Sequence, residues 1–182
     1  AVPLKEVNTN GGLDNITTLV DKGATVGISQ IDTWQSLSGG DEAIGRLKAV
    51  ASLNHNLMHI VVQKDGFDAG RQCTGKEILG KCVTGDWQPV KKVIEKETDL
   101  KGLTVAAVGS AQVLARTYLN KKLGLGIEVT DVDAKAGKSG DQIAFDLLKA
   151  GKVHAVITMA AYPAGGTSVG GLKQTDGLAL AN

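Results

Sequence analysis

Apolar residues recur with two different spacings along the chain, and the spacing changes at glycines. From Leu13 to Lys22 they fall every three or four residues, which predicts a helix that Gly23 can end in the left-handed conformation. The apolar segment Ala24–Ser29 predicts a short buried strand after this helix, and Leu4–Asn8 predicts a strand before it. The order of strand, helix and strand is typical of α/β proteins.

The same pattern returns late in the chain. Gly140 precedes a second helical pattern, Gly151 ends it, and the apolar segment Lys152–Met159 predicts the next strand. Two interpretations remain open: the two stretches are related α/β units, or any two helix-glycine-strand units look alike.

The middle of the chain predicts further elements. Leu57–Lys64 and Leu103–Val108 are apolar enough for buried strands, and a helix that Gly124 ends follows the second of them. Pro89–Lys96 predicts a short helix, because proline suits the first turn of a helix. Strands that alternate with helices favour a mainly parallel sheet, flanked by helices, in each of two lobes.

Composition, charge and the motifs that are missing argue against several classes of function. The 182 residues are 42% apolar and 21% charged, as in an ordinary globular protein, and the net charge of +1 argues against a nucleic-acid partner or a polybasic membrane patch. No apolar run approaches the roughly 18 residues of a membrane span. There is no P-loop, no GxGxxG after a strand and no zinc-ligand spacing, so we expect neither a cofactor nor a metal.

The two cysteines, Cys73 and Cys82, lie close together in the sequence. They form a disulfide if the protein matures in an oxidising compartment, and they are free thiols if it is cytosolic.

Polar and glycine residues gather where strands are expected to end. In open α/β sheets, ligands bind beyond the carboxyl ends of strands and next to helix N-termini, where free backbone N–H groups suit carboxylates or phosphates. Each residue alone could equally be a turn or a helix cap. Together they predict a ligand site made of Thr9, Asn10, Gly11, Gly12, Leu13, Ser29, Gln30, Asp32, Gly109, Ser110, Ala111, Gln112, Met159, Ala160 and Tyr162.

No arrangement of residues points to catalysis. His55, His59 and His154 are scattered, and the last two fall in apolar segments where a role in the core is the better interpretation. The stretch Gly109–Gln112 is not a nucleophile elbow, which needs G-x-S-x-G. We therefore expect no catalytic residue and a protein that is not an enzyme.

Four stretches, in order, carry a resemblance to a known family: "VNTNGGLDNITTLVDKGATVGISQIDTW", "LNHNLMHIVVQKD", "DLKGLTVAAVGSAQVLARTYLNKKLGL" and "AFDLLKAGKVHAVITMAAYPAG". The chain resembles the TAXI-type solute receptors of TRAP transporters, which have the type II periplasmic binding-protein fold. The match covers most of residues 7 to 166 and leaves out the stretch with the cysteines.

The resemblance implies a two-lobed, periplasmic or extracytoplasmic receptor. Such a receptor captures a small organic acid or amino acid between its lobes and delivers it to TRAP-type permease subunits. It implies that the site residues named above form the walls of the cleft. An oxidising compartment also favours the disulfide between Cys73 and Cys82.

On this basis the expected parts of the chain are lobe one (1–50), a strand crossing between the lobes (51–66), a cysteine-bearing insertion (67–98), lobe two (99–165) and a C-terminal segment (166–182). Compared with the family, the chain lacks a first strand-helix unit and a C-terminal part, and its "GSAQ" turn is less rich in glycine and serine. We therefore expect lobe one to be incomplete, with its open edge filled by Gly171–Asn182, by a neighbouring chain or by residues outside this sequence.

Two other functions remain open at this point. One is an enzyme on the same fold that handles a phosphoribosyl compound or prephenate, although no acid–base pair stands at the expected site. The other is a ligand-sensing input domain whose output domain lies outside this sequence.

Overall fold

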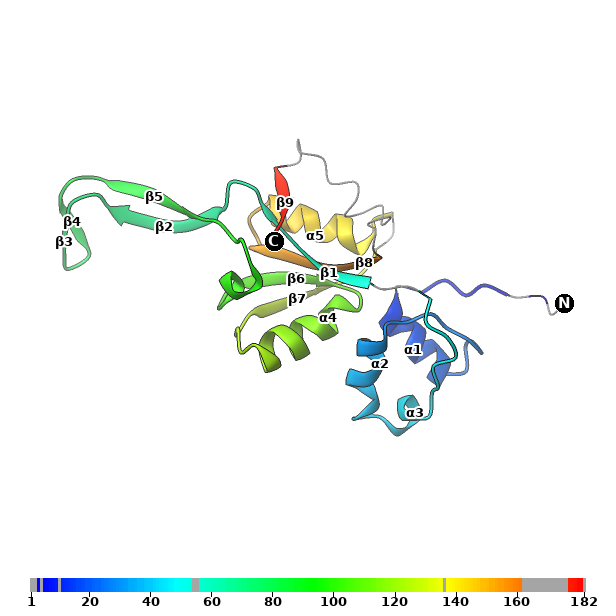
Figure 1. Ribbon diagram of the computed structural model, residues 1–182. Coiled ribbons are helices and arrows are strands. Elements are labelled where there is room, and N and C mark those ends of the chain that lie inside the picture. The colour runs from blue at the N-terminus through cyan, green and yellow to red at the C-terminus, as the bar shows by residue number, and fades with distance from the viewer. Residues whose placement is uncertain are drawn as a thin grey trace.

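The structure is a computed structural model, and it describes residues 3, 5–9, 11–53, 56–135, 137–161 and 177–181. Asn10 and Tyr162, both expected in the ligand site, lie outside the described residues. The described chain is an α/β protein with three visible parts: a sheet flanked by helices, a small helical body near the N-terminus, and a long β arm (Figure 1).

The centre of the molecule is a five-stranded sheet with the strand order β7-β6-β8-β1-β9. β6 runs parallel to β7 and to β8, as the sequence predicts, whereas β1 runs antiparallel to both β8 and β9. The sheet is therefore mixed. Its strands are β1 (Asn56–Gln63), β6 (Thr104–Val108), β7 (Glu128–Val132), β8 (Ala155–Ala161) and β9 (Leu178–Leu180).

Helices cover both faces of this sheet, which explains why the central strands β6 and β8 are largely apolar, whereas the edge strand β7 (EVTDV) is not. One face packs on α4 (Ala111–Leu114) and on η2 (Ala115–Lys122), a π-helix that continues it. The other face packs on α5 (Gly140–Lys149), through the fully buried Ala144 and Leu148. A short 3₁₀ helix, η1 (Glu97–Leu100), places Leu100 in the first of these two cores.

The helical body consists of α1 (Gly12–Val20), α2 (Ile31–Ser38) and α3 (Glu42–Gly45). Each helix buries one residue, namely Ile16, Thr33 and Ile44. The strands expected at 4–8 and 24–29 are wrong, because the described residues of this body contain no strand. Val26 is 78% and Ile28 68% exposed, so this apolar segment has no sheet to enter.

The cysteine-bearing stretch forms the arm. β2 (Phe67–Cys73) pairs with β5 (Trp87–Lys92), and β3 (Lys76–Ile78) pairs with β4 (Lys81–Thr84) beyond them. The helix expected at 89–96 is wrong: Pro89 lies in β5, opposite Arg71 and next to a bulge between Asp68 and Arg71. A bulge is one of the few places where a strand accommodates proline.

The structure contains the Cys73–Cys82 disulfide, with the two Cα atoms 5.4 Å apart. Of the C-terminal segment, β9 is described, and it adds to the edge of β1 in the five-stranded sheet instead of joining lobe one. Among the described residues, no helix is both long and apolar enough to cross a membrane.

Candidate functional site

Three parallel strands of the sheet end at one edge, and polar residues follow each of them. β6 leads into Gly109–Gln112, β7 leads into Asp133, and β8 carries Thr158, Met159 and Ala160 near its end. The carboxyl ends of parallel strands are where α/β proteins place ligands. The structure thus brings together the two sets of lobe-two residues that the sequence proposes.

The turn after β6 is held by a side-chain hydrogen bond to its neighbour. Gly109 adopts a φ of +56°, which turns the chain from β6 into α4. Ser110, Ala111 and Gln112 are all buried behind this turn. Gln112 Nε2 donates to Asp133 Oδ1 over 3.2 Å, so the turns after β6 and β7 are tied together.

The end of β8 is fixed in a similar way. Thr158 Oγ1 donates to Asp141 Oδ1 over 2.8 Å, and Asp141 lies in the first turn of α5. The side chain of Met159 packs against the core, and Ala160 is buried. These two predicted site residues can therefore offer a ligand little more than their backbone.

Arg116 stands near this edge but already has a partner. Its Nη2 donates to Asp131 Oδ2 over 2.8 Å, and Nη1 donates to the carbonyl oxygen of Gln112 over 3.3 Å. The hydrogen bond to Asp131 raises the pKa of Arg116, so the guanidinium stays charged. The arginine is engaged in connecting η2 to β7.

In the helical body, the predicted residues cluster around the first turn of α1. Ser29 Oγ donates to the carbonyl oxygen of Gly12 over 2.9 Å. A Cβ atom on Gly12 would lie 2.6 Å from Gln30 Oε1, so the Gln30 amide sits directly over this glycine. Thr9 is held nearby through a hydrogen bond to Asn15.

Two polar oxygens of the helical body are buried without a hydrogen-bond partner among the described residues: Gln30 Oε1, over the first turn of α1, and Thr33 Oγ1, in α2. Thr33 is only 1% exposed, and its N–H is capped by Asp32 Oδ1 at 2.8 Å. No side chain caps the first turn of α1, whose N-cap is Gly11. Unpaired buried oxygens are costly and uncommon, so a bound group that donates hydrogen bonds would stabilise them.

The helical body lies toward the sheet edge just described. It leads into the start of β1, and Asn56 in that strand pairs with Ala161 at the end of β8. α2 also contacts α4, the helix that begins next to Ser110 (Figure 1). Two of the residues expected from the two lobes, Gln30 and Ser110, are therefore the N-caps of helices that contact each other.

Sequence reasoning missed Thr33, Asp133 and Thr158, which belong to this region. Asp133 directly follows β7, a strand that the apolar pattern does not predict. His59 also stands opposite Thr158 in the β1–β8 register, and its Nε2 is buried without a partner among the described residues. His154 has a structural role: its ring meets Phe67 edge-on at 4.5 Å.

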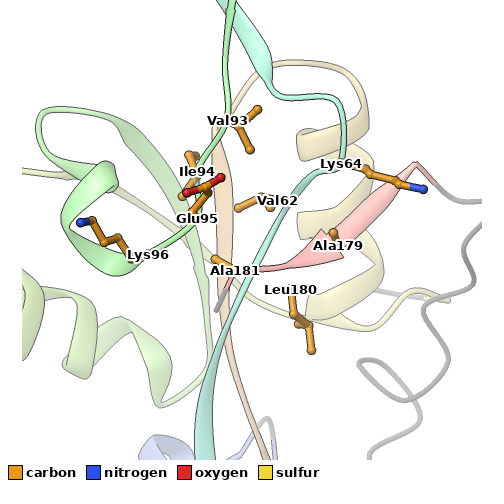
Figure 2. A pocket seen from close by; sticks show the side chains of 9 residues that line it. All are labelled: Val62, Lys64, Val93, Ile94, Glu95, Lys96, Ala179, Leu180 and Ala181. Carbon is orange, nitrogen blue, oxygen red and sulfur yellow. The ribbon is translucent and has the colours of Figure 1, made fainter.

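Two hollows between described residues lie elsewhere. The larger, of about 450 Å³, includes Val62, which pairs with the first residue of β8, so it is at the opposite end of the sheet (Figure 2). Within the described ranges, no three His, Cys, Asp or Glu residues are grouped as metal ligands would be.

No protein-family model and no curated protein matches the chain. The solved structures that are similar to it include the following three. An ancestral arginine-binding protein bound to arginine is 21% identical over 71% of this chain and 42% of its own, with a TM-score of 0.42. An ancestral arginine-binding protein bound to glutamine is 19% identical over 94% of this chain and 68% of its own, with a TM-score of 0.45.

The third is the second substrate binding domain of a putative amino acid ABC transporter from Streptococcus pneumoniae, 16% identical over 61% of this chain and 35% of its own, with a TM-score of 0.35. The chain thus spans well under half the length of two of these three structures. At these scores the likeness assigns neither a ligand nor a transporter to this chain.

Proposed function

We propose that the chain is an extracytoplasmic solute receptor that binds a small organic acid or amino acid between the helical body and the sheet edge. The observation that carries this proposal is the contact between α2, which follows Ser29 and Gln30, and α4, which follows Gly109 and Ser110. The disulfide in the arm agrees with an oxidising compartment such as the periplasm.

The chemistry of the region suits a small solute with a carboxylate. The uncapped first turn of α1 offers backbone N–H groups and a partial positive charge. Gln30 Oε1, which lies over Gly12, supplies an acceptor for an ammonium or hydroxyl group of the same solute, and Thr33 Oγ1 and Asp133 supply two more. In this proposal Gly11 and Leu13 line the first turn, and Asp32 holds the start of α2.

Delivery to TRAP-type permease subunits belongs to the same proposal and rests on the resemblance in sequence. The first test is mass spectrometry of the small molecules released when the purified protein is denatured. We expect an amino acid or a small organic acid in amounts comparable to the protein. Recovery of no such compound, together with no thermal stabilisation by any amino acid or organic acid, would contradict the proposal.

The second test uses two glycines. The variant Gly12→Ala should displace the Gln30 amide and weaken solute binding by about tenfold, or roughly 1.4 kcal/mol, measured by titration calorimetry. Gly39→Ala is the matched control, because a Cβ there meets no atom within 4 Å. Equal affinities of the two variants would show that Gly12 is only a turn residue.

A further inference from the structure

The tip of the β arm, residues 74–86, folds without a hydrophobic core. In the described stretch between Val62 and Ile94, no apolar side chain is buried. Every residue of β3 and β4 is exposed except Cys82, which is half-buried. A two-stranded hairpin with nothing packed on it is marginally stable in water. The tip therefore needs a source of stability other than the burial of apolar side chains.

The turn that joins β3 to β4 is unfavourable for its sequence. Leu79 and Gly80 connect the paired residues Ile78 and Lys81, and their φ values are both positive, at +49° and +74°. A type I′ turn requires positive φ at both central residues, and asparagine or glycine fits the first of them best. A leucine in this conformation is strained, because its Cβ crowds the following carbonyl oxygen. Packing does not offset the strain, since Leu79 is 98% exposed.

Hydrogen bonds hold the tip only weakly. β3 and β4 share three residue pairs, with a register shift between Lys76 and Glu77. Where the tip joins the ribbon of β2 and β5, Thr74 Oγ1 accepts a hydrogen bond from the N–H of Asp86 over 3.0 Å. Thr84 Oγ1 accepts one from the N–H of Lys76 over 2.9 Å. Both hydrogen bonds are exposed, so water competes for their donors and acceptors.

The Cys73–Cys82 disulfide spans the junction between the ribbon and the tip. Cys73 is the last residue of β2 and pairs with Trp87 in the ribbon, whereas Cys82 lies in β4, opposite Glu77. The bond closes a loop, with a sequence separation of 9, that contains all of β3 and the strained turn. In the chain-entropy model, closing a loop of this length shifts the equilibrium toward the folded form by about 100-fold. For a hairpin this weak, such a factor decides whether it is folded.

We propose that the tip of the arm is a redox-sensitive switch, which keeps its hairpin while Cys73 and Cys82 are joined and unfolds locally when they are reduced. The reductant is a dithiol: its two thiols become one disulfide, and its two electrons and two protons convert the Cys73–Cys82 bond to two thiols. No buried apolar side chain of the arm shields the bond, and the arm projects from the sheet (Figure 1). The sheet stays folded in both states, because neither of its cores contains a residue of the tip.

This switch is separate from the proposed ligand site. The arm leaves the sheet after Gln63, the last residue of β1, whereas the proposed site lies near the first residue of that strand, Asn56. Reduction therefore changes the outer surface of the arm and leaves solute binding unchanged. The ordered tip is a property of the protein in an oxidising compartment, whether or not the protein is a solute receptor.

Hydrogen exchange of the full chain, with and without dithiothreitol, tests the switch. The backbone amides of Thr74, Lys76 and Asp86 donate hydrogen bonds at the junction, so their protection reports on the tip. We expect reduction to raise their exchange rates by about 10- to 100-fold and to leave the amides of β6 and β8 unchanged. The variant C73S/C82S should exchange like the reduced protein in both conditions, which separates loss of the disulfide from other effects of dithiothreitol.

The variant Leu79→Asn tests the contribution of the strained turn. Asparagine tolerates the left-handed conformation, so the hairpin of this variant should be more stable without the disulfide. After reduction, its tip amides should exchange about 5-fold more slowly than those of the reduced unmodified protein. Val50→Asn is the matched control, because Val50 is 92% exposed and lies before β1, outside the arm. It should leave the exchange of the reduced tip unchanged.

Equal protection of the tip amides in the oxidised and the reduced protein would overturn the proposal. A loss of protection in β6 and β8 that matches the loss in the tip would overturn it too, because the disulfide would then support the whole fold. Iodoacetamide labelling counts the thiols that dithiothreitol produces. A folded protein in which no thiol forms would show that the bond is closed to reductants, and this result would also contradict the switch.

Discussion

The segments around α1 and α5 begin alike and end differently. Both helices start at a glycine and bury a residue at the matching position, Ile16 in α1 and Ala144 in α5. After α5 the chain enters β8, which lies between β6 and β1 and is buried. After α1 the segment 24–29, with apolar residues at 24, 26 and 28, forms no strand. An apolar pattern makes a strand possible, but a neighbouring strand has to be present to pair with it.

The two helices also differ at their first turns. Ser139 and Gln142 cap α5 reciprocally, with Gln142 N donating to Ser139 Oγ over 3.2 Å and Ser139 N donating to Gln142 Oε1 over 3.0 Å. The first turn of α1 has no side-chain cap. The start of α5 is thus satisfied by its own sequence, whereas the start of α1 is left for a ligand in the proposed function.

The largest expected effect is the loss of stability when a buried core residue of the sheet or of the helical body is replaced by alanine. Leu148→Ala removes a fully buried side chain from the sheet core and should lower the free energy of unfolding by about 2–5 kcal/mol. Ile16→Ala should destabilise the helical body instead, because Ile16 belongs to neither core of the sheet. Hydrogen exchange read by mass spectrometry should show lost protection in β6 and β8 for L148A, and in α1–α3 for I16A. Equal loss in β8 for both variants would contradict this separation.

A smaller effect on stability is expected from substitutions of the glycines at which α1 and α5 begin. A Cβ on Gly140 would lie 2.8 Å from Val108 Cγ1, inside the core, so Gly140→Ala should lower the free energy of unfolding by about 1–3 kcal/mol. Gly12→Ala meets the far end of the flexible Gln30 side chain and should change stability by less than about 0.5 kcal/mol. Urea unfolding followed by circular dichroism measures both. A larger loss in G12A than in G140A would reverse the comparison.

The smallest expected effect is a change of the unfolding free energy with pH. The hydrogen bond from Lys138 lowers the pKa of Asp146, in α5, below its ordinary value of 3.8. A carboxyl whose pKa is lowered on folding stabilises the protein above that ordinary value, and this contribution disappears as the pH falls through the lowered pKa. The difference in unfolding free energy between the unmodified protein and Asp146→Asn should therefore be constant near neutral pH and shrink in acid. Asp21→Asn, after α1, is the control, and an identical pH profile for it would contradict the assignment.

Much of the sheet could be predicted from local patterns. β1, β6, β8 and the helix after β6 fall where the apolar spacing places them, since both faces of the sheet are covered and these three strands are largely apolar. The arm was missed, because Pro89 suits a helix start as well as a strand next to a bulge, and only pairing with β2 decides between them. The polar turn Gly109–Gln112 was found because it directly follows a strand. Thr33 was missed because its burial depends on helix packing.

By itself, the sequence determined the class of the fold, the polar turn Gly109–Gln112 at the end of a strand, and the close pair of cysteines. These are local properties, set by apolar spacing, by glycine and by the short separation of Cys73 and Cys82. The tertiary structure decided that the segment 24–29 stays outside any described sheet, that β1 and β9 run antiparallel to their neighbours, and that the arm projects. Each of these depends on which strand is available as a hydrogen-bonding partner, and partners distant in the chain leave no mark in the local pattern.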